Sequence, residues 1–99
     1  MTINQKNWNR LSFFEQMSNI DGEVNRLTEC KPEYRDFYLA NILKLISATI
    51  ADPKNDSRRA PELLDEYQEA VDFTKGKYDA DYIKSYWNPY TEAAAQKLR

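Results

Sequence analysis

The segment between Pro32 and Pro53 places the strongest constraint on the fold, because apolar side chains surround most of it. Its apolar residues are Tyr34, Phe37, Tyr38, Leu39, Ile42, Leu43, Leu45, Ile46 and Ile50. Wound into a helix, they cover well over half of the circumference, and such a helix must pack against several neighbours. We therefore expect a helix over residues 32–51 at the centre of a helical bundle, ended by Pro53.

The residues before this segment have the pattern of an amphipathic helix. Ser12 and Glu15 form a capping box, in which each side chain binds a backbone N–H at the start of the helix. Apolar residues then follow at alternating spacings of four and three: Phe13, Met17, Ile20, Val24 and Leu27. This pattern predicts a helix over residues 12–30, after a polar lead-in at residues 1–11.

Two further helices are expected after a polar connection. The third, over residues 61–75, has an inner face formed by Leu63, Leu64, Tyr67, Ala70, Val71 and Thr74. The fourth is expected over residues 79–98, with Asp79 as its N-cap and a kink or break at Pro89. No strand-like alternation competes with these patterns. The predicted fold class is therefore all-α: a single antiparallel four-helix bundle that forms one domain over residues 1–99.

The sequence lacks several residue types on which catalytic sites depend. It contains no histidine, which excludes Ser-His and Cys-His nucleophile systems and zinc sites that need imidazole. Only two glycines are present, so no glycine-rich phosphate loop can form, and the single Cys30 has no partner for an intrachain disulfide. We therefore expect no cofactor and favour a non-enzymatic protein.

Charge and hydropathy indicate a cytoplasmic protein without a membrane segment. The formal net charge is -2 and is evenly spread along the chain, which disfavours a nucleic-acid partner but leaves it open. No stretch approaches the roughly 20 apolar residues of a membrane-spanning helix. The N-terminus also lacks the apolar core of a signal peptide.

Four tyrosines stand four residues apart near the end of the sequence, where a helix would stack them one turn above another. They are Tyr78, Tyr82, Tyr86 and Tyr90, with Ile83 and Trp87 between them. Three interpretations are open: core packing, a protein interface, or a platform on which single-stranded nucleic acid stacks. We expect a protein partner, or a second copy of the chain, to contact Tyr86, Trp87 and Tyr90 first.

A polar group accompanies the apolar seam of the first expected helix. Glu15, Asn19 and Glu23 recur at every fourth residue and therefore share one face. They form either a solvent-exposed edge or a hydrogen-bonded cluster with Arg58 or Arg59 from the connection before the third helix. Such a cluster would hold the connection in place rather than carry out chemistry.

Acidic residues line one side of the third expected helix, and Glu69 and Asp72 read as an E-x-x-D motif. Two carboxylates at this spacing can hold a magnesium ion. The motif resembles that of the MazG-like nucleotide pyrophosphohydrolases, although the E-x-x-E that this group carries on another helix is missing. The resemblance reaches Glu69 and Asp72 alone and implies a magnesium-dependent pyrophosphohydrolase as an alternative function. The other interpretation is a solvated acidic face.

The opening of the sequence resembles an uncharacterised family of small all-helical microbial proteins. The family pattern is W-x-x-L-S-x-x-E-Q-x-x-N-I-x-x-E-V-x-R, and the matching residues run from Trp8 to Arg26. The resemblance continues over residues 49–55 and thins out toward Trp87 and Tyr90. It implies a helical bundle and a cytoplasmic protein, and it carries no established activity.

The leading functional hypothesis is a non-enzymatic helical module that binds another protein, or a second copy of itself, through residues 79–98. The missing catalytic residue types and the wide aromatic face of that segment favour it. The alternatives are the magnesium-dependent pyrophosphohydrolase and an accessory subunit of a nucleic-acid-processing system.

Overall fold

The computed structural model describes residues 2–55, 59–77 and 79, and all regular secondary structure in this part of the chain is helical. The elements in chain order are α1 (Gln5–Trp8), α2 (Phe13–Glu29), the 3-10 turn η1 (Pro32–Tyr34), α3 (Arg35–Ala51) and α4 (Arg59–Thr74). The predicted all-α class is confirmed for the described residues. The expected helix over residues 79–98, with its kink or break at Pro89, lies outside them except for Asp79.

The start of α2 has the capping box that the sequence predicts. Ser12 Oγ accepts a hydrogen bond from the backbone N of Glu15 at 3.1 Å, and Glu15 Oε1 accepts one from the backbone N of Ser12 at 3.0 Å. The helix ends before Cys30, whose extended backbone leads toward Pro32. Four residues of the predicted apolar seam are fully buried, namely Met17, Ile20, Val24 and Leu27.

The central helix α3 begins later than predicted, because a 3-10 turn precedes it. The backbone N of Tyr34 donates to the carbonyl oxygen three residues before it at 2.9 Å, and the α-helical pattern starts only at Arg35. Such turns are common at helix N-termini, and Pro32, which has no N–H to donate, fits the first position. The other end agrees with the prediction, since Asp52 precedes Pro53 and has an extended backbone.

The helix α4 begins two residues before the predicted start. A proline in the first turn of a helix breaks no hydrogen bond, so Pro61 does not mark the boundary. The helix ends at Thr74, and Gly76 follows with a positive φ of 81°, from which its backbone N donates to Phe73 O at 2.9 Å. The inner face is rotated from the predicted one, because Phe73 is buried whereas Leu64 is 48% exposed.

Residues 1–11, predicted to be a polar lead-in, contain the short helix α1 and contribute to the core. Asn4 caps this helix, and its Oδ1 accepts a hydrogen bond from the backbone N of Asn7 at 3.1 Å. Trp8 is buried at one end of the core, and Ile3 packs against the same cluster. Periodicity could not reveal this helix, because four residues are too few to show a helical repeat.

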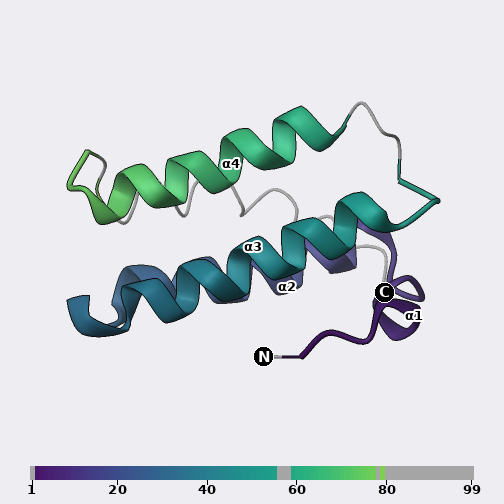
Figure 1. Cartoon of the computed structure of the whole chain (residues 1–99), viewed down its shortest axis with the longest axis horizontal. Coiled ribbons are helices and arrows are strands. Elements are labelled where there is room, and N and C mark those ends of the chain that lie inside the picture. Colours follow the sequence, from purple (N-terminus) through teal and green to yellow (C-terminus); the bar gives the residue numbers. More distant parts are fainter. Residues whose placement is uncertain (1, 56–58, 78, 80–99) are drawn as a thin grey trace.

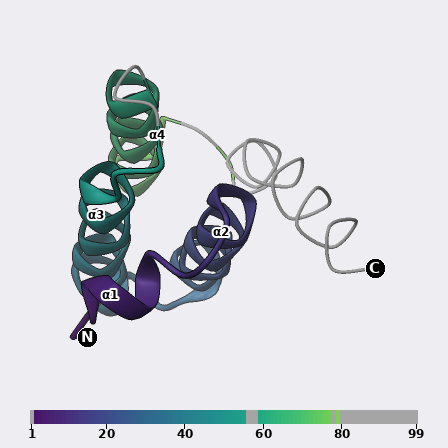
Figure 2. The same cartoon turned by 90° about the vertical axis from the view of Figure 1, so that its right-hand side faces the viewer.

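The helix α3 is central among the described helices, as the sequence predicts. Both α2 and α4 pack along it, and the chain reverses direction from α2 to α3 and from α3 to α4 (Figure 1). The two neighbours approach α3 from different sides, so that α3 lies at the corner of the arrangement (Figure 2). The guanidinium of Arg59 stands 4.0 Å over the ring of Phe13, which ties the start of α4 to the start of α2.

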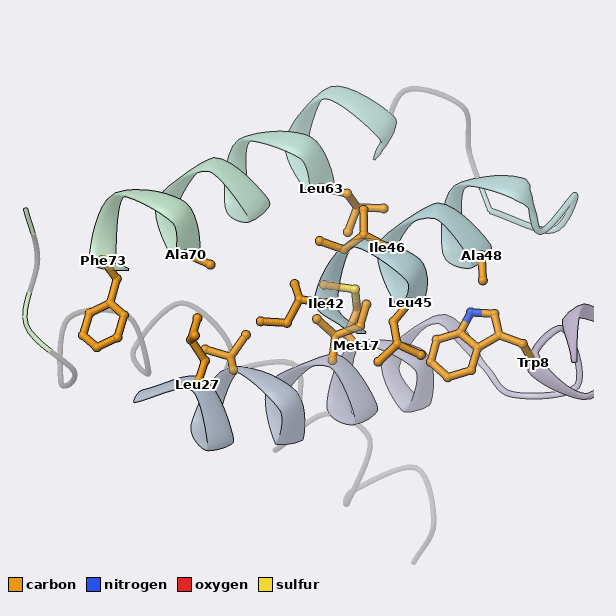
Figure 3. Packing of buried hydrophobic residues seen from close by; sticks show 12 residues of the cluster. Trp8, Met17, Leu27, Ile42, Leu45, Ile46, Ala48, Leu63, Ala70 and Phe73 are labelled. Carbon is orange, nitrogen blue, oxygen red and sulfur yellow. The ribbon is translucent and has the colours of Figure 1, made fainter. Parts of the chain in front are cut away.

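The hydrophobic core fills the space where α2 and α4 meet α3 (Figure 3). Ile42 and Ile46 of α3 are fully buried, and Figure 3 shows them facing Met17 of α2 and Leu63 of α4. Fully burying one such side chain contributes about 1.5–3 kcal/mol, which stabilises helices that would be marginal alone. None of the helices in the described part of the chain has both the length and the apolar character needed to cross a membrane.

Candidate functional site

A polar network joins α1, the first turns of α2 and the turn that follows α3. We call it the end network, and its members are Trp8, Gln16, Thr49, Asp52, Lys54 and Asn55. Four of the six are buried, namely Trp8, Gln16, Thr49 and Asp52. All six fall within residues 8–16 and 49–55, two stretches far apart in the sequence that these hydrogen bonds bring together.

Gln16 is the centre of the end network and is fully buried. Its Nε2 donates to Trp8 O at 3.0 Å and to Asp52 Oδ2 at 2.7 Å, and its Oε1 accepts from Asn55 Nδ2 at 3.0 Å. Both amide protons are therefore used, as is the carbonyl oxygen. A buried amide with all its partners costs little to bury and specifies one arrangement of the three segments that it joins.

Trp8 and Thr49 extend the network into the core. Trp8 Nε1 donates to Thr49 Oγ1 at 3.1 Å, and Thr49 Oγ1 in turn donates to Leu45 O at 2.8 Å. Asn55 Nδ2 also donates to Thr49 O at 2.8 Å, so the same side chain closes the turn after α3. A further hydrogen bond, from Gln5 Nε2 to Ala48 O at 2.8 Å, attaches α1 to α3. The network therefore fastens the N-terminal residues to the end of α3.

Asp52 is the buried charge of the network. Burial by itself would raise the pKa of this carboxyl, but hydrogen bonds from Lys54 and Gln16, together with the positive charge of Lys54, hold the pKa below its usual value. The ammonium of Lys54 pairs with Asp52 Oδ2 and also donates to Asn9 O at 2.8 Å. The charge is thus neutralised locally, and the groups of the network are engaged with one another rather than directed at a reactant.

The lowered pKa of Asp52 predicts a pH dependence of stability. A carboxyl whose folded pKa lies below its unfolded value, about 4, stabilises the fold fully above that value and loses this contribution as the pH falls below it. We expect Asp52→Asn to destabilise the protein at pH 7 and the difference from wild type to shrink as the pH approaches 3. Urea unfolding at a series of pH values gives the free energy of unfolding of the wild type and of the variant.

The exposed Asp65 on α4 provides the matched control for this experiment. We expect Asp65→Asn to change the free energy of unfolding by no more than about 0.5 kcal/mol at pH 7. A constant difference between wild type and Asp52→Asn from pH 7 to pH 3 would contradict the assignment, because only the charged form of Asp52 pairs with Lys54.

The predicted polar group of α2 does not form one cluster. Asn19 Nδ2 donates to the backbone oxygen of Glu15 at 2.9 Å, which keeps both on the helix surface. Glu23 is instead buried against α3, where its carboxylate pairs with Arg26 at 2.7 Å and accepts from Asn41 Nδ2 at 3.3 Å. Glu23 therefore serves the contact between α2 and α3, a role that local spacing could not show.

The two arginines of the alternative interpretation, a hydrogen-bonded cluster, are not seen with this polar group in the described residues. Arg59 lies over the ring of Phe13 rather than among the carboxylates of α2, and Arg58 is outside the described residues. A planar guanidinium over an aromatic face is favourable because the ring carries negative charge on its face. The start of α4 is thus held by a stacking contact.

Glu69 and Asp72, the alternative magnesium ligands, lie on the last turns of α4. Asp72 Oδ1 accepts from Gln68 Nε2 at 3.1 Å and stands 3.5 Å from the ammonium of Lys77. Within residues 2–55, 59–77 and 79, no three histidine, cysteine, aspartate or glutamate side chains come together in a way that could hold a metal ion. The described part of the chain therefore adds no third side chain of these four types to the pair.

Tyr86, Trp87 and Tyr90, the predicted partner-binding residues, lie outside the described residues, as do the other tyrosines of that pattern. The described chain offers a different candidate surface on the side of α3 that is turned away from α2 and α4 (Figure 2). We call it the outer face of α3. It consists of the eight exposed residues of that helix: Asp36, Phe37, Ala40, Leu43, Lys44, Ser47, Ile50 and Ala51.

The composition of the outer face is unusual for a solvent-exposed helix surface. Phe37 is 56% exposed, and Leu43 and Ile50 are each 37% exposed. Only Asp36 and Lys44 among its residues carry a charge. An open groove of about 680 Å³ adjoins its second half, between α3 and the N-terminal residues Thr2, Ile3 and Gln5. Large apolar side chains exposed along one face of a helix are typical of protein contact sites.

Comparison with protein-family models, with curated proteins and with solved structures finds no match to this chain. The sequence contained signals for both the end network and the outer face of α3. Gln16 falls between Phe13 and Ile20 in the apolar seam, and a polar side chain in such a seam indicates a buried hydrogen-bond network. The apolar residues around most of α3 likewise predicted that this helix packs against several neighbours.

Proposed function

We propose that this chain is a non-enzymatic helical module that acts by binding a protein, with the outer face of α3 as a contact surface. One observation carries the proposal: Phe37, Leu43 and Ile50 remain exposed on the most apolar helix of the described chain. Covering these side chains removes apolar area from water, which contributes roughly 25 cal/mol per Å². The few charges on this face keep the cost of desolvation low.

The end network also supports the proposal, because it is a structural feature of the scaffold. Its buried polar groups are occupied in joining α1 to α3, so they stiffen the scaffold that presents the outer face. Tyr86, Trp87 and Tyr90 remain in the proposal as a second contact region, on the basis of the sequence alone. The proposal also retains the complete antiparallel bundle, with residues 79–98 as its fourth helix, and a cytoplasmic setting.

Photo-crosslinking at two positions tests the contact surface. A benzophenone amino acid is incorporated at position 37 on the outer face or, as the matched control, at position 64 on α4, where Leu64 is 48% exposed. We expect irradiation of native cells to give a discrete protein adduct from position 37 and none from position 64. The adduct should disappear when Leu43→Glu is added, with circular dichroism showing that the chain stays helical.

Two results would overturn the proposed contact surface. One is the absence of any adduct from position 37 under conditions in which the probe reacts. The other is an equal set of adducts from both positions, because this pattern reflects general exposure rather than a specific surface. The mass of the adduct identifies the partner as a second copy of this chain or as another protein.

A further inference from the structure

We infer that residues 80–98 pack against the sides of α2 and α4 that are turned toward each other, with the Tyr82 hydroxyl donating to a buried acceptor there. These residues are the fourth helix of the proposed function, on which the inference rests, and the outer face of α3 is not involved. We call the surface that they cover the α2–α4 faces. It consists of Asp21 and Asn25 on α2 and of Arg59, Glu66, Glu69 and Phe73 on α4.

The spacing of the α4 residues places them on the side of this helix that is turned toward α2. Arg59, Glu66 and Phe73 recur at every seventh residue, which is about two turns of an α-helix, so they share one side. Arg59 stands over the ring of Phe13 on α2. At the other end of α4, Figure 3 shows Phe73 and Leu27 of α2 pointing toward each other.

The two α2 residues lie on the flank of this helix that borders α4. Asp21 and Asn25 are one turn apart and lie on the flank opposite Glu23. Glu23 contacts α3 through Asn41, so the flank of Asp21 is turned away from that contact. Asp21 is also one turn from Met17, which lies in the core where α4 packs on α3 (Figure 3).

Side chains of the α2–α4 faces are buried, although α2 and α4 scarcely contact each other. Asp21, Glu66 and Phe73 are all buried. The contacts of α2 and α4 are mainly with α3, which covers other sides of both helices. The burial is present in a single copy of the chain, so a further segment of the same chain supplies the cover. The longest segment outside the described residues is 80–99.

The connection after α4 and the length of the segment fit this placement. The helix ends at Thr74, and Gly76 follows with a positive φ, which allows the chain to reverse its direction. As a helix, residues 80–98 span roughly 28 Å, and the 16 residues of α4 span roughly 24 Å. The segment can therefore return along the whole of α4.

Buried acceptors on both helices select the chemistry of the contact. Asn25 Oδ1 and Glu69 Oε2 are buried and have no hydrogen-bond partner among the described residues. A buried acceptor without a donor is costly, so a group that covers these atoms should bring a donor as well as apolar area. A tyrosine supplies both, because it buries an aromatic ring and keeps an O–H donor.

An antiparallel return along α4 brings Tyr82 to these acceptors. Asn25 and Glu69 lie four or five residues before the ends of α2 and α4, and these ends are on the same side of the molecule (Figure 1). Tyr82 lies three residues after Asp79, at the matching height after the turn. Trp87 lies about 140° further round the same helix, which leaves it to the second contact region of the proposed function.

Intrachain disulfide trapping tests where the segment lies. Cys30, the only cysteine, is first replaced by serine, and Asn25→Cys is then combined with Tyr82→Cys in one chain. We expect mild oxidation at low protein concentration to link the two positions within the monomer, because facing residues of packed helices come within the span of a disulfide. The matched control combines Tyr82→Cys with Leu43→Cys on the outer face of α3, and it should give no link.

The two cysteine pairs separate this inference from the proposed contact surface. Absence of a link to Asn25→Cys would overturn the inference and would leave the outer face of α3 as the proposed contact surface. A link to Leu43→Cys in its place would overturn both, because the chain would then cover its own outer face.

Removal of the Tyr82 hydroxyl tests the hydrogen bond. We expect Tyr82→Phe to lower Tm by about 4–8 °C, the shift that corresponds to one buried hydrogen bond in a domain of this size. Tyr34→Phe, at an exposed tyrosine, should change Tm by no more than about 2 °C. In a background of Asn25→Ala and Glu69→Ala, the effect of Tyr82→Phe should vanish. An unchanged Tm for Tyr82→Phe, or an equal fall in both backgrounds, would overturn Tyr82 as the donor.

Discussion

Replacement of Ile46 by alanine is expected to lower the free energy of unfolding by about 2–5 kcal/mol. Ile46 is fully buried where α4 and α2 pack on α3 (Figure 3). Removing its side chain loses the transfer free energy of three carbon atoms and leaves a cavity that three packed helices cannot close. Urea unfolding followed by circular dichroism measures the change.

Ile50, one helical turn further along, is the matched control. It has the same side chain on the same helix but is 37% exposed on the outer face. At a protein concentration low enough to keep the chain monomeric, Ile50→Ala should cost less than about 1.5 kcal/mol. Equal losses at both positions would contradict the placement of Ile50 on the outer face. The pair thus separates the core from the proposed contact surface without changing the chemistry of the substitution.

Replacement of Gln16 by alanine is the second large expected effect, with a loss of about 2–4 kcal/mol. The substitution removes three buried hydrogen bonds, after which Trp8 O keeps only the backbone N–H of Leu11 and Asp52 Oδ2 only the ammonium of Lys54 as donors among the described residues. It also creates a cavity between α2 and the turn after α3. The same unfolding experiment measures the loss.

Two further variants show whether the hydrogen bonds or the volume of Gln16 matter. Gln16→Glu keeps the volume but has no amide protons for Trp8 O and Asp52, and it adds a negative charge beside Asp52, so it should be at least as damaging as alanine. Gln68→Ala, at an exposed glutamine of α4, should stay within about 0.5 kcal/mol of wild type. A tolerated Gln16→Glu would mean that the end network does not hold the fold together.

The end network and the outer face have complementary roles in the proposed module. The network attaches α1 to the end of α3 through contacts between residues far apart in the chain, such as Gln16 with Asp52. That attachment also places residues 2–5 beside α3 and forms one wall of the groove next to the outer face. Gln16→Ala is therefore expected to disturb both the contact surface and the stability, whereas Ile50→Ala should disturb the contact surface with a smaller loss of stability.

Parts of the candidate site could be read from the sequence because they depend on neighbours along the chain. The capping box of Ser12 and Glu15 involves residues three apart, and the extended residue before Pro53 is a local steric effect. The roles of Glu23 and Asp52 could not be predicted from neighbouring residues in the sequence. Their partners Asn41 and Gln16 lie 18 and 36 residues away in the sequence, on other helices.

The sequence by itself determined the helical class, the seam of α2 and the central position of α3, because apolar periodicity, caps and prolines act within a few residues of one another. Only the tertiary structure decided which sides of α3 are covered. Periodicity shows that Ile46 and Ile50 both belong to an apolar helix. The apolar pattern does not distinguish the side of the helix that is buried from the side that is exposed. The packing of α2 and α4 buries Ile46 and leaves Ile50 exposed, and this difference creates the surface proposed to bind a partner.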